Sequence, residues 1–341
     1  MIIFFIYIIL IILINFFVNK YQLILSNTGL SHQKFVNNSI PLTGGIFSLL
    51  PTIYLLFPDH IFFICIFISL FFLGLLSDLN ILASPKKRFF LQCILILFFT
   101  LISKIDVTPT KVIFFDNLIQ NNYLGYIFSA FCLMILINGS NFIDGLNGLL
   151  LGYFLLILFL IFQLDLINIF NFSQEKYVYF VIILLFILVL NFLNKLFLGD
   201  SGAYSLSFFL GFLLIKIYNY NLNISPYFII LLLWYPCFEN LFSIIRKIFF
   251  KKKDPLEPDT DHLHQKLFVF CKKNLKISSL KSNILSSLII LSFNFLIFYF
   301  ASKSISHTIY QLSLIGISIV VYLTVYYLIH KITNKKNFII L

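Results

Sequence analysis

The feature that most constrains this chain is a series of apolar runs, each roughly 16 to 22 residues long, that recur from one end to the other. Such a run can cross the hydrocarbon core of a bilayer as a helix. A soluble fold of 341 residues would expose many more charges, yet only 11% of these residues are charged and 60% are hydrophobic. The composition therefore excludes an ordinary soluble domain and predicts an all-α polytopic membrane protein.

The runs predict about eleven transmembrane helices in one integral domain, residues 1–341. The first run has neither a basic segment before it nor a small-residue cleavage site after it, which indicates a retained helix rather than a signal peptide. The predicted spans are 1–18, 42–57, 61–76, 89–104, 124–138, 146–162, 177–193, 203–218, 227–244, 284–301 and 309–330.

The positions of the basic residues predict the orientation of the chain. Loops on one side of the predicted spans hold 19 of the 24 Lys and Arg residues. Because basic loops stay in the cytosol, we expect the N-terminus outside and the C-terminus inside. The net charge of +11 then marks cytosolic loops and anionic lipid headgroups rather than nucleic-acid binding. The predicted cytosolic loops are 19–41, 77–88, 139–145, 194–202, 245–283 and 331–341.

Unusual polar residues collect in four of these predicted cytosolic loops, as a reaction on a water-soluble substrate requires. The first cluster has Ser77 and Asp78 at the end of a span, followed by Lys86, Lys87 and Arg88. A carboxylate with three nearby cations suits a metal ion or a proton acceptor beside a phosphate anchor. The alternative interpretation of the three cations is a topological stop signal.

The second cluster repeats polar side chains at every third position, with glycines between them: Asn138, Asn141, Asp144 and Asn147. Polar groups at a membrane helix junction are costly, and they are functional by default. Helix capping would explain one of the four but not all of them. We therefore expect a ligand-binding segment here.

The third and fourth clusters add a carboxylate and two imidazoles. Asp200 lies in the segment Phe197–Gly202, and oxygen ligands of this kind suit Mg²⁺, which binds through one or two carboxylates plus substrate phosphates. A helix N-cap is the alternative. His262 and His264 have no further ligands at zinc-finger spacing, so we expect them to bind a diphosphate, with solvated loop histidines as the alternative.

The order of these clusters resembles the polyprenyl-phosphate N-acetylhexosamine-1-phosphate transferase family, whose bacterial members start peptidoglycan, O-antigen and teichoic-acid lipid intermediates. The resemblance extends from about Ser31-His32 through Pro41–Gly45 to His264, and its specific motifs are residues 138–149 and 197–202. It implies a Mg²⁺-dependent transferase, with Mn²⁺ as a substitute, in the bacterial inner membrane. The enzyme would move a sugar 1-phosphate from a UDP-N-acetylhexosamine to polyprenyl (undecaprenyl) phosphate and release UMP at a cytosolic active site.

The resemblance also implies roles for single residues. Asp200 would bind the metal ion, and Asp144 and Asp78 would be carboxylates of the catalytic centre. The implied substrate-binding residues are Lys86, Lys87 and Arg88 for the lipid phosphate, Phe197 and Asn147 for the uracil, His262 and His264 for the diphosphate, and Asn138 and Asn141.

One alternative to this family branch and two to enzyme function stay open. Gln265 stands where the muramoyl-pentapeptide branch carries a third histidine, so the N-acetylglucosamine branch is favoured and phospho-N-acetylmuramoyl-pentapeptide transfer is second. A membrane transporter is one alternative to an enzyme, and a transporter should carry ionisable residues deep in its spans. A catalytically inactive scaffold is the remaining alternative, and the sequence leaves open whether the chain forms a homodimer.

One departure from the family concerns its two adjacent aspartates after the third span. If the family's motif is aligned from Gly74, Ser77 replaces the first aspartate and Asp78 is the second. If it is aligned backwards from Ser84-Pro85, Asp78 is the first aspartate and Leu79 replaces the second. The family's first aspartate is proposed to deprotonate the lipid phosphate. Because the second pKa of a phosphate is about 6, the acceptor is largely dianionic at neutral pH and a dedicated base is dispensable. Direct displacement is favoured over a covalent intermediate on Asp144 or Asp78.

The charge pattern makes a testable prediction about topology. In a variant without native cysteines, a cysteine at position 141 or 261 should react with a membrane-impermeant maleimide only after the cells are permeabilised, since these loops are predicted to be cytosolic. A cysteine at position 59, in a predicted outer loop, is the control that should react in intact cells. Labelling of position 141 in intact cells would overturn the orientation.

Overall fold

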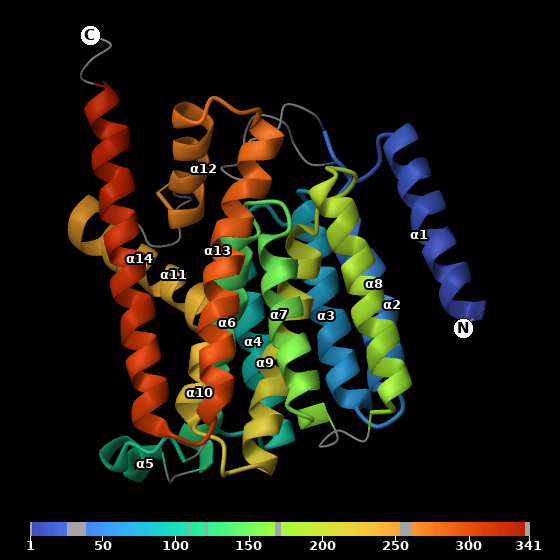
Figure 1. The fold of residues 1–341 in the computed structure, drawn as a ribbon. Coiled ribbons are helices and arrows are strands. Elements are labelled where there is room, and N and C mark those ends of the chain that lie inside the picture. The colour runs from blue at the N-terminus through green and yellow to red at the C-terminus, as the bar shows by residue number, and fades with distance from the viewer. Residues whose placement is uncertain are drawn as a thin grey trace.

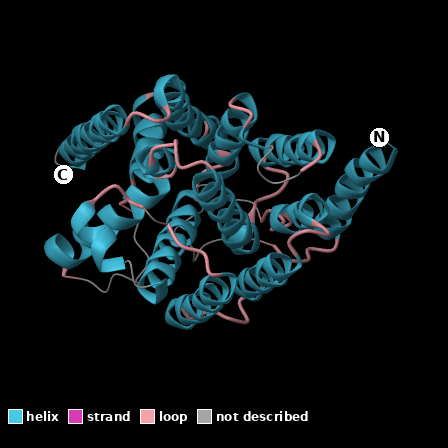
Figure 2. Ribbon diagram, turned by 90° about the horizontal axis from the view of Figure 1, so that it is seen from below, coloured by secondary structure: helices cyan, strands magenta, loops and turns pink. Residues whose placement is uncertain are grey.

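The computed structural model describes residues 2–25, 39–107, 109–119, 122–167, 172–252 and 261–337. Every regular element in these ranges is helical (Figure 2), apart from one isolated bridge between Leu25 and Pro41. The all-α prediction is confirmed for this part of the chain. Most helices run side by side, with α1 at one edge and α14 at the other (Figure 1).

The elements follow one another in this order: α1 (Ile2–Lys20), α2 (Gly44–Leu56), α3 (Ile61–Asp78), α4 (Pro85–Ser103), α5 (Ile113–Ile119), α6 (Asn122–Ile143), α7 (Leu149–Gln163), α8 (Gln174–Phe192), α9 (Gly199–Tyr220), α10 (Pro226–Leu232), α11 (Trp234–Ile245), the π-helix η2 (Arg246–Lys251), α12 (Leu263–Asn274), α13 (Ser279–Ala301), the 3₁₀ turn η3 (Ser302–Ser304) and α14 (Thr308–Asn337).

Ten of the eleven predicted spans coincide with a single helix, and the span predicted at 227–244 is a bent pair. Six helices of the described residues are long and apolar enough to cross a membrane, or seven if the bent pair counts as one span. Three more apolar helices, α1, α2 and α7, are shorter. The protein is therefore a multi-pass membrane protein, while the count of eleven spans and the orientation stay predictions.

The bend between α10 and α11 has a local cause. The two helices meet at 74° around Leu233. Pro236 has no N–H for the carbonyl of Leu232, and its ring clashes with a carbonyl four residues earlier in a continuous helix. The carbonyl of Leu232 accepts a hydrogen bond from the Tyr153 hydroxyl instead, at 2.9 Å. A side chain from α7 therefore satisfies the backbone group that the proline leaves free.

Helix α9 lies at the centre of the bundle and is the most buried of the long helices. Its N-terminal half is rich in small residues, which let neighbouring helices approach closely. It packs most extensively against α3, and also against α6 and α2. The small residues of that half are Gly199, Ser201, Gly202, Ala203, Ser205 and Ser207.

A short backbone pairing holds the start of α9 in place. The N–H of Phe197 donates to the carbonyl of Pro41 at 2.8 Å, and the N–H groups of Gly44 and Gly45 donate to Phe197 and Leu198 at 2.9 Å each. The Pro41–Gly45 motif is thus a clamp between the start of α2 and the segment that leads to Asp200. Ser31 and His32, which belong to the same predicted loop, lie outside the described residues.

The predicted cytosolic loop 245–283 contains η2, α12 and the start of α13. Helix α12 forms because one face of it is apolar and buried, and because a capping box starts it. The side-chain oxygen of Gln265 accepts from the backbone N–H of His262 at 3.3 Å. Likewise α6 continues through most of the predicted loop 139–145, to Ile143.

Candidate active site

Asp200, in the first turn of α9, is the centre of a buried polar cluster. Its Oδ2 accepts hydrogen bonds from the Ser77 hydroxyl and from Nη1 of Arg88, each at 2.6 Å, and from the Tyr204 hydroxyl at 3.2 Å. Arg88 also donates to the Ser77 oxygen. The Asp200 carboxylate is 15% exposed, so the ion pair with Arg88 is shielded from solvent.

Only one of the three predicted phosphate-binding cations makes this contact. Arg88 reaches the carboxylate from the first turn of α4, whereas the side chains of Lys86 and Lys87 are exposed at the start of that helix. The backbone N–H of Lys87 bonds to the Ser84 hydroxyl, which caps α4. The role of Lys86 and Lys87 in lipid-phosphate binding stays a prediction.

Asp78, the last residue of α3, caps α9 from outside. Its Oδ1 accepts the N–H of Asp200 at 2.8 Å, and its Oδ2 accepts the N–H of Ser201 at 3.1 Å. The first N–H groups of a helix have no partner within the helix, and the helix dipole favours a negative charge at that end. Asp78 therefore stabilises the turn that presents Asp200.

The register of α3 is fixed by close packing at Gly74. A Cβ at Gly74 would lie 2.4 Å from Cα of Ser201, so no other residue lets the two helices approach this closely. One turn further on, Ser77 faces Asp200, whereas the side chain of Leu79 is 40% exposed. The geometry agrees with counting from Gly74: Ser77, not Leu79, occupies the position beside the metal-ligand candidate.

Asp144 adds a third carboxylate to the same end of α9. It follows α6, is partly buried, and accepts a hydrogen bond from the N–H of Gly199. Burial raises the pKa of Asp144 well above its ordinary range, and the nearby charges of Asp200 and Asp78 raise it further. Three carboxylates and one arginine thus surround the start of this helix, which leaves an excess of negative charge for cations to offset.

The carboxylates do not by themselves enclose a metal ion. Within the described residues, no group of three or more His, Cys, Asp or Glu side chains is arranged to hold one. Both oxygens of Asp78 are bonded to backbone N–H groups, and Oδ2 of Asp200 is bonded to three donors. A metal ion at Asp200 would therefore need further ligands from a substrate, which is how Mg²⁺ commonly binds.

Asn147 is tied into a network that joins three helices. Its N–H donates to Oδ1 of Asn283 at 2.7 Å, and its Nδ2 donates to the carbonyl of Asn191 at 3.0 Å and to Oδ1 of Asn194. Asn191 and Asn283 were missed by the sequence analysis, although a polar amide inside an apolar run is the signal that reveals such residues. With its N–H groups engaged here, Asn147 offers a base only its side-chain oxygen.

The two other asparagines of the second cluster, Asn138 and Asn141, differ in their hydrogen bonding. Nδ2 of Asn138 donates to the Met134 carbonyl at 2.9 Å and lies 3.5 Å from Oε1 of Gln92 in α4. Oδ1 of Asn141 is buried without a hydrogen-bond partner among the described residues. A buried acceptor of this kind is costly unless a ligand or water satisfies it. Asn141 is therefore the better candidate for a direct ligand contact.

His262 is held by Glu239, an acidic residue of α11 that is fully buried. Nδ1 of His262 lies 2.9 Å from Oε1 of Glu239, and the N–H of Leu263 donates to the same oxygen at 3.3 Å. Oε2 of Glu239 accepts from the Tyr322 hydroxyl of α14 at 2.8 Å. Glu239 was missed by the sequence analysis, and its signal is that it is the one acidic residue in the predicted span 227–244.

His264 is fully buried, and neither of its ring nitrogens has a hydrogen-bond partner within the described residues. Its ring stacks on that of His262, with the centroids 5.5 Å apart. Burial lowers the pKa of His264 to about 3, so the ring is neutral at physiological pH. A Cβ at Gly145 would lie 2.9 Å from Nε2 of His264, so the glycine is needed for the imidazole to reach the Asp144 turn.

The four predicted polar clusters therefore meet at one end of the bundle. Asp78 of the first contacts Asp200 of the third, and Asp144 of the second contacts Gly199 beside it. His264 of the fourth packs against Gly145 of the second. Asp259 and Lys253, in the predicted cytosolic loop 245–283, lie outside the described residues.

Comparisons with known proteins find one matching family model and several similar enzymes. Residues 60–218 match the model of the family described as Glycosyl transferase family 4. The chain is 28% identical over 247 residues to an undecaprenyl-phosphate alpha-N-acetylglucosaminyl 1-phosphate transferase of Thermotoga maritima, and the match covers 71% of each chain. It is 29% identical over 232 residues to a phospho-N-acetylmuramoyl-pentapeptide-transferase of Dictyoglomus thermophilum, covering 64% of this chain and 71% of the other.

A third relative, a probable undecaprenyl-phosphate N-acetylglucosaminyl 1-phosphate transferase of Bacillus subtilis, is 29% identical over 208 residues, which cover 58% of this chain and 55% of the other. The segment matched by the family model contains Ser77, Asp78, Arg88, Asp144 and Asp200. The resemblance predicted from the motifs is therefore confirmed: across residues 60–218 this chain is similar to glycosyl transferase family 4.

Proposed function

We propose that this protein transfers an N-acetylhexosamine-1-phosphate from a UDP-sugar to polyprenyl phosphate, releasing UMP, on the cytosolic side of a bacterial inner membrane. The observation that carries the proposal is the meeting of Asp78, Asp144, Asp200 and Arg88 with the two histidines at one end of the bundle. The relatives' names support the reaction class, since all three are sugar-1-phosphate or muramoyl-pentapeptide transferases.

The N-acetylglucosamine branch is the better supported of the two. Gln265 occupies the position of a third histidine, and its side chain is committed to capping α12 through the N–H of His262. The relatives include both kinds of enzyme in equal number, so Gln265 is what favours this branch. Phospho-N-acetylmuramoyl-pentapeptide transfer is therefore the second candidate.

The proposed reaction is a direct displacement. An oxygen of the acceptor phosphate forms a bond to the phosphorus that carries the sugar, and the bond from that phosphorus to the UMP oxygen breaks. A covalent intermediate is disfavoured because Asp78 and Asp144 already accept backbone hydrogen bonds, which stabilise their carboxylates and reduce their nucleophilicity. Positioning and charge compensation are then the main contributions of the protein.

Charge compensation has two sources in this proposal. Arg88 brings a fixed positive charge to the place where two anionic substrates meet. Asp200 would hold Mg²⁺ together with the donor diphosphate, and the ion would offset the negative charge that develops on the phosphates. Ser77 and Tyr204 keep the Asp200 carboxylate in one orientation through their hydroxyl groups.

The buried polar atoms that have no hydrogen-bond partner among the described residues can bind the parts of the UDP-sugar that the metal ion does not hold. The neutral ring of His264 can donate a hydrogen bond from one nitrogen and accept one at the other, and Oδ1 of Asn141 can accept one. Both lie buried beside the carboxylates, where a diphosphate or a base would satisfy them. Glu239 is proposed as a positioning residue, because it fixes the ring of His262 and thereby the stack that holds His264.

The function is tested directly with purified protein, undecaprenyl phosphate, Mg²⁺ and a panel of UDP-N-acetylhexosamines that includes the muramoyl pentapeptide. We expect release of UMP and a lipid-linked product with UDP-N-acetylglucosamine. Asp200→Asn should reduce turnover at least a thousandfold, since an amide is a poor ligand for a hard cation. It should also abolish the fall in the free Mn²⁺ signal that electron paramagnetic resonance detects when the ion binds in the presence of the UDP-sugar.

Asp59→Asn, at an exposed aspartate on the other end of α3, is the matched control and should keep full activity. Turnover with only the muramoyl donor would assign the second branch. Full activity in EDTA, or a fully active Asp200→Asn, would refute the metal site.

Ser77 and Asp78 should behave differently from each other. Ser77→Ala should keep most of the rate, because Arg88 still holds Asp200 and the dianionic acceptor needs no base. Asp78→Asn should lose at least about tenfold, or ~1.4 kcal/mol, because an amide has only one oxygen for the two N–H groups that Asp78 accepts. The rate should rise with pH up to the second phosphate pKa of about 6 and then level off.

Ser77→Asp is the discriminating variant for this account. It should show the same pH profile as the wild type. If it raises the rate strongly and shifts the profile, a general base is limiting and the dianion explanation is wrong. If Asp78→Asn costs nothing, the capping of α9 does not matter for catalysis.

Glu239→Gln should raise the KM for the UDP-sugar about tenfold and change kcat much less, because His262 loses a charged partner while the carboxylate cluster stays intact. Tyr322→Phe removes only the hydrogen bond to the other oxygen of Glu239 and should stay within about twofold of wild type. Substrate titrations of both variants give KM and kcat separately. If Glu239→Gln instead lowers kcat about tenfold and leaves KM unchanged, His262 lies outside the donor site.

A further inference from the structure

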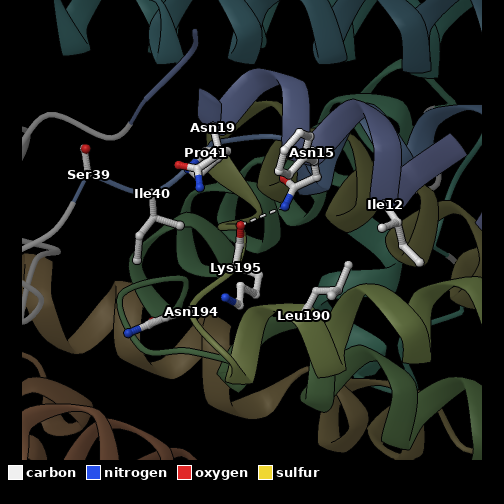
Figure 3. Close-up of a pocket in the computed structure, with 10 residues that line it drawn as sticks. Ile12, Asn15, Asn19, Ser39, Ile40, Pro41, Leu190, Asn194 and Lys195 are labelled. Carbon is white, nitrogen blue, oxygen red and sulfur yellow. Dashed lines mark hydrogen bonds between the residues drawn. The ribbon is translucent and has the colours of Figure 1, made fainter. Parts of the chain in front are cut away.

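A groove of about 510 Å³ runs between α1 and the end of α8. Figure 3 shows it in close-up. Helix α1 supplies residues three and four apart, so they form one stripe of its surface. The segment before α2, the last part of α8 and the turn after it supply the rest. The lining residues are Ile12, Asn15, Phe16, Asn19, Ser39, Ile40, Pro41, Leu190, Asn194 and Lys195.

The two ends of this groove differ in chemistry. Ile12 and Leu190 lie at one end, while Asn19, Asn194 and Lys195 lie toward the other (Figure 3). Of the ten lining residues none is acidic, and Lys195 is the one that carries a charge. An apolar channel that leads to a cation and primary amides matches an amphipathic anion.

The groove is built from fixed parts rather than from a loosely placed helix. Nδ2 of Asn15 donates to the carbonyl of Lys195 at 3.0 Å, and Oδ1 of Asn15 accepts from the Thr43 hydroxyl at 2.8 Å. The Tyr7 hydroxyl donates to the carbonyl of Phe47 at 2.7 Å. These contacts hold α1 against the bundle at two levels, while the exposed side chain of Phe16 faces the space that remains open.

We propose that this groove binds an anionic glycerophospholipid of the membrane. Its phosphate would lie between Lys195 and the amide of Asn19, and an acyl chain would follow Ile12 and Leu190. A phosphodiester carries one negative charge, which one lysine offsets, whereas a phosphate monoester such as polyprenyl phosphate carries about −1.5 to −2 at neutral pH. The charge of the groove therefore fits a phospholipid better than the proposed acceptor, and the inference does not depend on the transfer reaction.

The bound lipid would also touch the asparagine network of the candidate active site. Asn194 lines the groove, and its Oδ1 accepts from Nδ2 of Asn147. Lipid binding at this position would restrict the turn after α8, which leads directly to Asp200. Anionic lipid is thus expected to stabilise the folded protein as any ligand of the native state does.

Native mass spectrometry of the detergent-purified protein, titrated with phosphatidylglycerol or phosphatidylcholine, tests the proposal. Wild type should retain one phosphatidylglycerol in preference to phosphatidylcholine. Lys195→Gln should weaken phosphatidylglycerol binding about fivefold, the effect of one lysine at an anionic lipid. Ile12→Trp, which fills the apolar end and keeps the charge, should weaken the binding of both lipids.

Two matched variants separate the groove from the general surface. Lys20→Gln removes a cation of α1 outside the groove, and Leu13→Trp enlarges an exposed side chain beside Ile12 that does not line it. Both should bind phosphatidylglycerol as wild type does. An equal loss with Lys20→Gln, equal retention of both lipids by wild type, or one-for-one displacement of phosphatidylglycerol by undecaprenyl phosphate would each overturn the assignment.

Discussion

The hydrogen bonds from the first N–H groups of α9 to the carboxylate of Asp78 are the contact on which the rest of the site depends. They join the ends of two helices that are 122 residues apart in the chain, across the packing at Gly74. Because the first N–H groups of a helix have no partner of their own, a carboxylate from a neighbouring helix can fix both its position and its rotation. That rotation turns Asp200 toward Ser77 and Arg88, and it turns the N–H of Gly199 toward Asp144.

Charge explains why the other polar loops gather at the same end. Three carboxylates around one helix start repel each other, and burial makes their ionised forms still less favourable. Arg88 and the helix dipole offset part of this cost, and a divalent cation with an anionic substrate would offset the remainder. The three carboxylates are therefore electrostatically more favourable in a complex with cation and substrate than in the isolated protein. This is expected where binding and catalysis rely on preorganised charge.

Buried polar side chains inside the apolar helices hold this end of the bundle together. Asn191 and Asn283 bond to the turn at Asn147, and Glu239 links α11 to α12 and α14 through His262 and Tyr322. In a membrane a lone polar group of this kind finds no water, so pairing it across helices specifies which surfaces meet. The supporting network is thus drawn from spans that composition alone marks only as hydrophobic.

The sequence by itself determined the class of fold, the place of nearly every long helix, and the four polar clusters, because apolar length and costly membrane polarity are local properties of a chain. It also revealed the resemblance to glycosyl transferase family 4, through motifs that hold Asp144 and Asp200. Only the tertiary structure decided that Ser77 rather than Leu79 faces Asp200, that Arg88 rather than Lys86 or Lys87 makes the ion pair, and that Glu239 holds His262. Helix rotation and packing across more than a hundred residues of chain decide such contacts, and no local pattern records them.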